Sequence, residues 1–214
     1  MAIAGKSARV RVMNTTSPSA FTNQATTADS TNTRYTITND TFRYWSRLTP
    51  VTVERSTDSG ATWTAVTSGF RIGHAGGVVL FDAAQDPTHQ IRVSGQYVTV
   101  TTAALVREYT FAINDQIENR TSFDDEGWHR KMITLIDASG TLTGFYDVDN
   151  FLQDRILAGT PLVIELDYDS EDASGEYLSF YALLSSHEAM AAVAGLVDTS
   201  VPWETDDEVF VVQK

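Results

Sequence analysis

The chain has 214 residues, 42% of them hydrophobic, and its 28 Asp and Glu against 15 Lys and Arg give a formal net charge of −13. Sandwiches and barrels of β-strands often reach this length as one domain with a sizeable core. The lack of cysteine excludes disulfides, thiol nucleophiles and Cys-based metal sites. No stretch resembles a signal peptide or the roughly 20 apolar residues of a membrane helix, so we expect synthesis in a cytoplasm.

The charge is divided unevenly between the two halves of the chain. Residues 1–100 carry nine Lys and Arg and six Asp and Glu, whereas residues 101–214 carry the other six bases and 22 acids. An acidic surface aids solubility in any protein. It also suits copies that stack head to tail and leave an acidic surface toward DNA, since a DNA duplex carries about one negative charge per 1.7 Å. The composition argues against nucleic-acid recognition.

Alternation of apolar and polar residues predicts antiparallel strands with one buried face. In the first half the alternating segments are 9–13, 34–38, 51–55, 90–94 and 97–101. Residues 14–33 are instead mostly Ser, Thr, Asn, Gln and Ala. Because this stretch lacks an apolar period, we expect an exposed arm or mobile loop that becomes ordered on assembly.

The second half continues the alternation, and short sequences that end in glycine predict the turns along the whole chain. The alternating segments are 108–113, 131–137, 162–167, 177–182 and 209–212. The predicted turns are at 58–60, 76–77, 94–95, 139–140 and 174–175. About ten to twelve short strands at this spacing predict a mainly β fold, an antiparallel sandwich or barrel.

Two segments break the alternation. Residues 147–158 place Val148, Leu152 and Ile156 at helical spacing, and a following glycine can end the helix. We therefore predict a flanking α-helix there. Residues 186–195 predict a second, shorter helical turn.

No motif predicts a catalytic, cofactor-binding or metal site. Ser56–Trp63 fits the Asp-box pattern of sialidase-like propellers, but propellers carry one copy per blade and this chain has one copy. We interpret it as a stable hairpin. His187–Glu188 lacks the second histidine of a metalloprotease motif, because residue 191 is Ala. The acidic run 167–172 lacks the glycine and final glutamate of a calcium loop. Scattered histidines occupy positions 74, 89, 129 and 187.

An ordered set of short motifs covers roughly the second half of the chain. These motifs are Thr121–Trp128, Ile136–Gly140, Thr143–Phe145, Leu157–Thr160 and Leu184–Glu188. In this order and spacing the chain resembles the tail tube (major tail) proteins of long-tailed bacteriophages. In the first half only Ser94–Tyr97 is similar to that family.

The resemblance implies a single tail-tube-like domain over residues 1–214, with two packed sheets and a flanking helix. It implies a structural virion protein rather than an enzyme, with six copies forming a ring and stacked rings forming a hollow tube for DNA. The implied partners are further copies of the chain, the tape measure protein, and the tail terminator and distal tail proteins. No cofactor is implied.

Alternate residues of a strand share a face, so Glu165, Asp167 and Asp169 are candidates to line the lumen of such a tube. The alternative is that the face shared by these three residues belongs to the outer wall of the tube. Trp45, Trp128 and Trp203 are candidates for the core or for subunit joints.

The alternative function is a carbohydrate-binding or other virion-surface β-sandwich. In such a module the tryptophans, with Trp63, would share an exposed platform.

Overall fold

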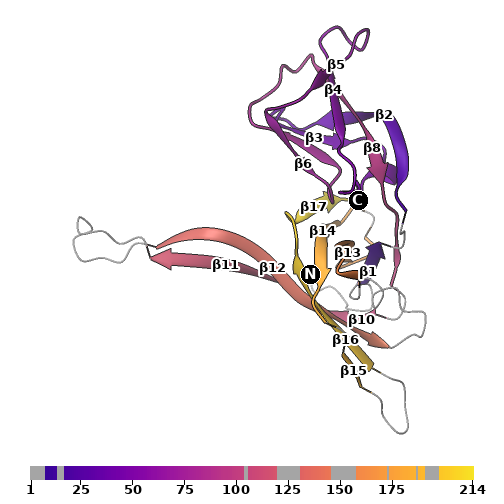
Figure 1. The fold of residues 1–214 in the computed structure, drawn as a ribbon, viewed down its shortest axis with the longest axis vertical. Helices are drawn as coiled ribbons and strands as arrows, with labels where there is room; N and C mark the ends of the chain where they lie inside the picture. The colour runs from indigo at the N-terminus through magenta and orange to yellow at the C-terminus, as the bar shows by residue number, and fades with distance from the viewer. Residues whose placement is uncertain are drawn as a thin grey trace, which may run out of the picture. The chain divides into compact units, whose positions relative to one another are not determined.

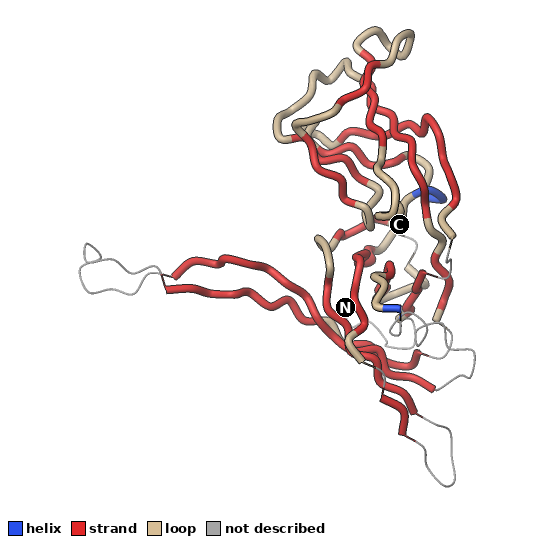
Figure 2. Tube along the Cα trace, in the orientation of Figure 1, coloured by secondary structure: helices blue, strands red, loops and turns tan. Residues whose placement is uncertain are grey.

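The computed structural model describes residues 8–13, 17–103, 106–119, 131–145, 158–172, 174–186, 188–190 and 198–214. These residues form 17 antiparallel strands, and their helical structure is almost confined to one 3-10 turn at Asp40–Phe42 (Figures 1 and 2). Contacts divide the chain into two compact units. Unit 1 comprises residues 1–103, 162–181 and 208–214, and unit 2 comprises residues 104–161 and 182–207.

Unit 1 contains a seven-stranded sheet built from one continuous stretch of chain. Its strands are β2 (Ser19–Ala28), β3 (Arg34–Ile37), β4 (Thr52–Ser56), β5 (Thr64–Val66), β6 (Phe70–Gly73), β7 (Val78–Phe81) and β8 (Gln90–Tyr97). Their order in the sheet is β5-β4-β8-β2-β3-β7-β6. The sheet encloses a core of its own around Trp45, with Phe21, Tyr35, Val53 and Val93 among the buried residues. Burial of aromatic and β-branched side chains is the main force that holds such a sheet together.

The second sheet of unit 1 has its strands in the order β9-β1-β13-β14, and β17 pairs with β14. The strands are β1 (Arg9–Met13), β9 (Val100–Thr102), β13 (Leu162–Asp167), β14 (Glu176–Leu184) and β17 (Phe210–Gln213). Met13 of β1 lies opposite Val100 of β9. Met13 and Val100 are therefore paired, although all seven strands of the other sheet lie between them in the sequence.

The two sheets of unit 1 are joined by buried hydrogen bonds. The Tyr181 hydroxyl donates to the Trp45 carbonyl over 2.7 Å, and the Ser179 hydroxyl donates to the Ala75 carbonyl over 2.6 Å. Each bond satisfies a polar group that would otherwise be buried without a partner, which costs about 1–3 kcal/mol. Unit 1 is thus held by polar bonds as well as by apolar packing.

Unit 2 is organised around one long strand. Its strands are β10 (Val106–Tyr109), β11 (Ala112–Asn119), β12 (Lys131–Phe145), β15 (Glu188–Met190) and β16 (Asp198–Thr205). Strand β12 pairs with β10, β11 and β16 along different parts of its length, and β15 pairs with β16. Residues Ala182–Leu184 at the end of β14 also pair with β16. Leu142, Val201 and Trp203 form the buried centre of this unit.

Every alternating segment coincides with or overlaps a strand, which confirms most of the predicted strands. Segments 97–101 and 108–113 are exceptions, because each spans the end of one strand and the start of the next. The structure has more strands than the ten to twelve expected. Several of the extra strands have only three or four residues, as in β5, β6 and β15, and such short segments give a weak alternating pattern.

Two of the predicted turns are wrong. Gly95 lies inside β8 and Gly140 lies inside β12. A Cβ atom on Gly140 would stand 2.0 Å from the Thr110 carbonyl oxygen and 2.6 Å from the Trp203 ring, so glycine is required there by close packing. Gly95 lies opposite Phe21, where β2 carries a bulge. Glycine inside a strand commonly marks such sites.

The prediction of an arm or loop over 14–33 is wrong for its central part, which is strand β2. Strand β2 pairs with both β3 and β8, and Phe21 is buried beneath it. Strand pairing uses main-chain groups, so a polar Thr-rich segment can join a sheet when a single aromatic anchors it.

The helix predicted over 147–158 lies outside the described residues except for its last position. The helical turn predicted near 186–195 is wrong at residues 188–190, which form β15. Pairing with β16 determines the conformation of Glu188–Met190 despite the helical propensity of these residues. The single domain over residues 1–214 stays a prediction.

Candidate assembly surface

One element of unit 2 is a two-stranded ribbon. It consists of β11 and residues 131–138 of β12, and it extends beyond the other strands of the unit (Figure 1). Among the described strands, β11 pairs only with β12, and this part of β12 pairs only with β11. Within the described chain the ribbon therefore has two free edges of main-chain donors and acceptors. Two strands alone are marginally stable in water, and free edges readily pair with other strands.

Both faces of β11 are exposed along residues 112–115. Four consecutive residues of β11, Ala112–Asp115, are exposed. The side chain of Ile113 is 63% exposed and that of Ile136 is 73% exposed. Ile113 lies opposite Ala138 and Ile136 lies opposite Asp115, so the two isoleucines are diagonal neighbours on one face. Covering each of them fully would contribute about 1.5–3 kcal/mol.

The base of the ribbon is held firmly. The Thr205 hydroxyl donates to Asp137 over 2.6 Å and accepts from the Ala138 amide over 3.0 Å. The Thr110 amide donates to the Thr141 carbonyl over 2.9 Å. Because these bonds tie the ribbon to β16 and to the chain before β11, its direction within unit 2 is fixed while its edges remain open.

The acidic residues predicted to line a lumen occupy a different environment. Glu165 is 0% exposed and Asp167 is 1% exposed, so the expectation of a solvent-facing acidic face is wrong for both. They do share one face, as the alternation predicted, but that face meets arginines across the strand pair. Arg11 lies opposite Glu165, and Arg9 lies opposite Asp167.

Each buried carboxylate has a cationic partner. Glu165 forms a salt bridge with Arg11 and accepts a hydrogen bond from the Tyr44 hydroxyl. Asp167 forms salt bridges with Arg9 at 3.2 Å and with Lys214 at 2.9 Å. The burial of a charge is tolerated when such pairing compensates it. These residues therefore hold β1, β13 and the C-terminus together.

The charges shift the pKa values of the surrounding side chains. Burial lowers the pKa of Arg11, but the charge and hydrogen bond of Glu165 outweigh this effect and the net pKa is raised. Burial raises the pKa of Tyr44, and the Glu165 charge raises it further. The Tyr44 hydroxyl thus keeps its proton and remains a donor to Glu165.

The remaining predicted residues divide between the core and the surface. Asp169 follows β13 and is half-buried, and its lumen role stays a prediction. Trp45 and Trp203 are buried in the cores of their own units and cannot belong to an exposed platform. Trp128 lies outside the described residues. Ile113 and Ile136 could not be singled out from the sequence, because alternation shows that a strand has an apolar face without showing whether anything covers it.

Neither a metal site nor a membrane helix is found in the parts of the chain that the structure describes. No group of three His, Asp or Glu side chains there is placed to hold a metal ion. None of the helical stretches there has the length and hydropathy needed to cross a bilayer.

No family model matches the chain, and no curated protein matches its sequence. Three solved structures are similar in part. The tail of an empty GTA particle with C6 symmetry has 13% identity and a TM-score of 0.46, over 53% of this chain and 86% of the other. A native gene transfer agent virion has 14% identity and a TM-score of 0.44, over 53% of this chain and 88% of the other. The SPP1 tail tube has 12% identity and a TM-score of 0.38, over 77% of this chain and 77% of the other. At these TM-scores the likenesses establish nothing about the function of this chain.

Proposed function

We propose that this chain is a structural subunit of a phage tail tube, in which copies join through the β11–β12 ribbon. The observation that supports the proposal is the ribbon itself, which is open at both edges and carries two exposed isoleucines. The class of assembly comes from the resemblance of the second half of the sequence to tail tube proteins.

The two edges of the ribbon support the proposal of ring formation. One copy offers the edge of β11 and, on the other side, the edge of β12 at residues 131–138. Pairing β11 of one copy with β12 of the next is a head-to-tail contact, and such contacts close into a ring when the rotation between copies fits. A closed barrel of ribbons leaves no free edge. The resemblance implies six copies per ring.

Stacked rings would form a hollow tube through which DNA passes without specific binding. The composition supports this role, since the chain carries a net charge of −13 and its second half is strongly acidic. A cationic lining would hold the phosphate backbone and slow its movement. The virion is the corresponding location, and the tape measure, tail terminator and distal tail proteins are the corresponding partners.

Negative-stain microscopy of the concentrated protein tests the proposal. We expect rings or tubes from the natural chain, and dispersed particles from the double variant Ile113→Asp/Ile136→Asp, because carboxylates at these positions would be buried at the joint without partners. The matched control is Leu48→Asp, which replaces a leucine that is 76% exposed in unit 1.

Circular dichroism of each variant reports whether the subunit still folds. Tubes formed by the folded double variant, or a natural chain that stays monomeric at every concentration, would contradict the proposal.

A further inference from the structure

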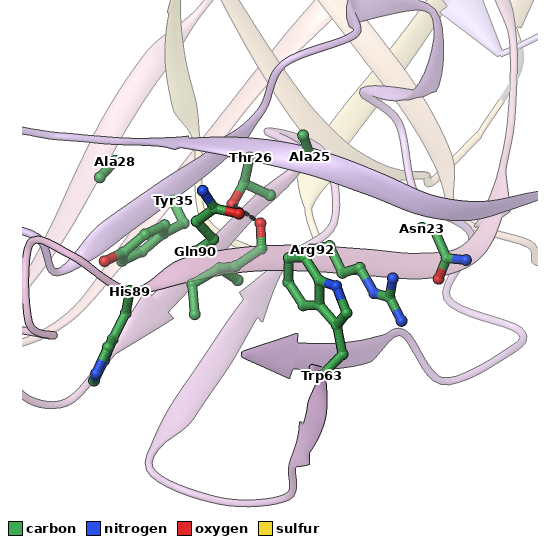
Figure 3. Close-up of a pocket in the computed structure, with 10 residues that line it drawn as sticks. Asn23, Ala25, Thr26, Ala28, Tyr35, Trp63, His89, Gln90 and Arg92 are labelled. Atoms are coloured by element: carbon green, nitrogen blue, oxygen red, sulfur yellow. Dashed lines mark hydrogen bonds between the residues drawn. The ribbon is translucent and has the colours of Figure 1, made fainter. Parts of the chain in front are cut away.

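The seven-stranded sheet carries a groove on its surface, formed entirely by residues of unit 1. The groove has a volume of about 420 Å³, within the usual range of small-molecule sites. Strands β2, β3 and β8 contribute to it together with the hairpin between β4 and β5 (Figure 3). Tyr35 and His89 lie toward one end, Asn23 lies toward the other, and Trp63 and Arg92 lie between them.

Trp63 is placed in the groove by the Asp-box hairpin. Asp58 accepts hydrogen bonds from the amide and hydroxyl of Thr62, at 2.8 and 2.6 Å, and from Ser56 at 2.7 Å. These bonds lower the pKa of Asp58 to about 2, so the loop is held by a carboxylate throughout the neutral range. The Trp63 indole donates to the Gly60 carbonyl over 3.1 Å. The hairpin thus presents a fixed, half-buried indole.

The charges beside the indole are already paired. The Arg92 guanidinium lies 4.3 Å from the centre of the Trp63 ring, and its Nε donates to Glu54 over 2.8 Å. The indole is held by a cation–π contact on this side, and the cation is neutralised by its own carboxylate. The groove therefore combines an aromatic surface with no uncompensated charge.

Two buried polar atoms in the groove have no hydrogen-bond partner within the described chain, namely the Tyr35 hydroxyl and Nδ1 of His89. Tyr35 is almost completely buried, and burial raises the pKa of its hydroxyl, which therefore remains a donor. Most buried polar groups in proteins have a partner, and leaving one unsatisfied costs about 1–3 kcal/mol. These two unsatisfied groups therefore belong to residues that line the groove.

Two carboxamides complete the polar lining. Asn23 lies at the bulge of β2 with a φ of 52°, a left-handed conformation that turns its side chain out of the regular strand pattern. Gln90 begins β8, beside the hairpin glycine Gly60. Carboxamides both donate and accept hydrogen bonds, as sugar hydroxyls do.

We propose that this groove binds a neutral saccharide. An indole surface suits the apolar face of a sugar ring, and the hydroxyl, imidazole and carboxamide groups suit its hydroxyls. An anionic ligand would need a free cation, and Arg92 is paired with Glu54. A purely apolar ligand would leave Tyr35 and His89 unsatisfied. The proposal does not depend on tube formation, because every lining residue belongs to the segment between β1 and β9.

Saturation-transfer NMR on the full chain tests this site. The probes are maltose, cellobiose, lactose and diacetylchitobiose at millimolar concentration, with sialyllactose as the anionic comparison. We expect at least one neutral disaccharide to bind, and Trp63→Ala and Asn23→Gly each to weaken that binding by about tenfold.

Asn32→Gly is the matched control, because Asn32 also has a positive φ of 53° but does not line the groove. Glycine preserves the backbone at both positions, so Asn23→Gly should remain folded even if Trp63→Ala does not. The proposal is overturned if no neutral disaccharide binds, if only sialyllactose binds, or if Asn23→Gly and Asn32→Gly bind equally well.

Discussion

Single residues of unit 1 show how burial changes the meaning of a charge. Glu165 and Asp167 alternate along β13 as exposed acids would, yet both are enclosed by their own unit. Their partners Arg9 and Arg11 alternate in the same way on β1. A strand alternation of charged residues can therefore mark a buried ion-pair ladder when the neighbouring strand carries the opposite charge in register.

The two members of the Arg11–Glu165 pair should differ in their effect on stability. Arg11→Met leaves the fully buried Glu165 without its cation and should lower the free energy of unfolding by about 3–5 kcal/mol. Glu165→Gln should cost less, because the Arg11 side chain is 30% exposed and can still reach water. Urea denaturation measures both.

Arg71→Met is the control for this comparison, since its pair with Glu208 is exposed and should contribute at most about 1 kcal/mol. Equal losses for Arg11→Met and Arg71→Met would show that the buried ladder adds no stability of its own.

A glycine in unit 2 should also be sensitive to substitution. Gly140→Ala places a Cβ against the Thr110 carbonyl and the Trp203 ring, and such overpacking should cost about 1–3 kcal/mol. Gly95→Ala is the matched change in another strand, where the nearest atoms lie at 3.4 Å, and it should change stability by less than about 1 kcal/mol. Thermal unfolding compares the two, and a Gly140→Ala variant as stable as the natural chain would contradict this packing.

Among the elements, the ribbon differs in solvent exposure from the strands that are buried within their unit. Strand β13 is buried along its whole length, whereas residues 112–115 of β11 are exposed. Strand β13 has four apolar residues of six and β11 has three of eight, but neither composition shows what covers the strand. The difference arises from how many neighbours the fold supplies on each side.

The ribbon should therefore respond to assembly more than any buried strand. In hydrogen exchange we expect those amides of residues 112–115 that point away from β12 to exchange rapidly in the free subunit and to become protected in assembled rings, because a second strand would then pair with the free edge. The β13 amides should be slow in both states and serve as the internal control. If the exchange rates at residues 112–115 did not change on assembly, the contact between copies would have to lie elsewhere on the chain.

For the whole molecule, the net charge of −13 makes the association of copies less favourable. Like charges on neighbouring copies repel, and salt screens exposed charges beyond about 10 Å at 0.1 M. Assembly should therefore be favoured by added sodium chloride, as measured by sedimentation velocity. Dissociation of assemblies on adding salt would show instead that complementary ion pairs dominate the joint.

The sequence by itself determined the mainly β class and the places of most strands, because alternation follows directly from the geometry of a strand with one buried face. It also determined the Asp-box hairpin, whose hydrogen bonds are local. Only the tertiary structure decided that β2 joins a sheet, that Gly95 and Gly140 lie within strands, and that Glu165 is enclosed. Each of these depends on contacts with residues far away in the chain, such as Arg11, Tyr44 and Trp203. Local pattern carries no information about which distant side chain will cover a given face.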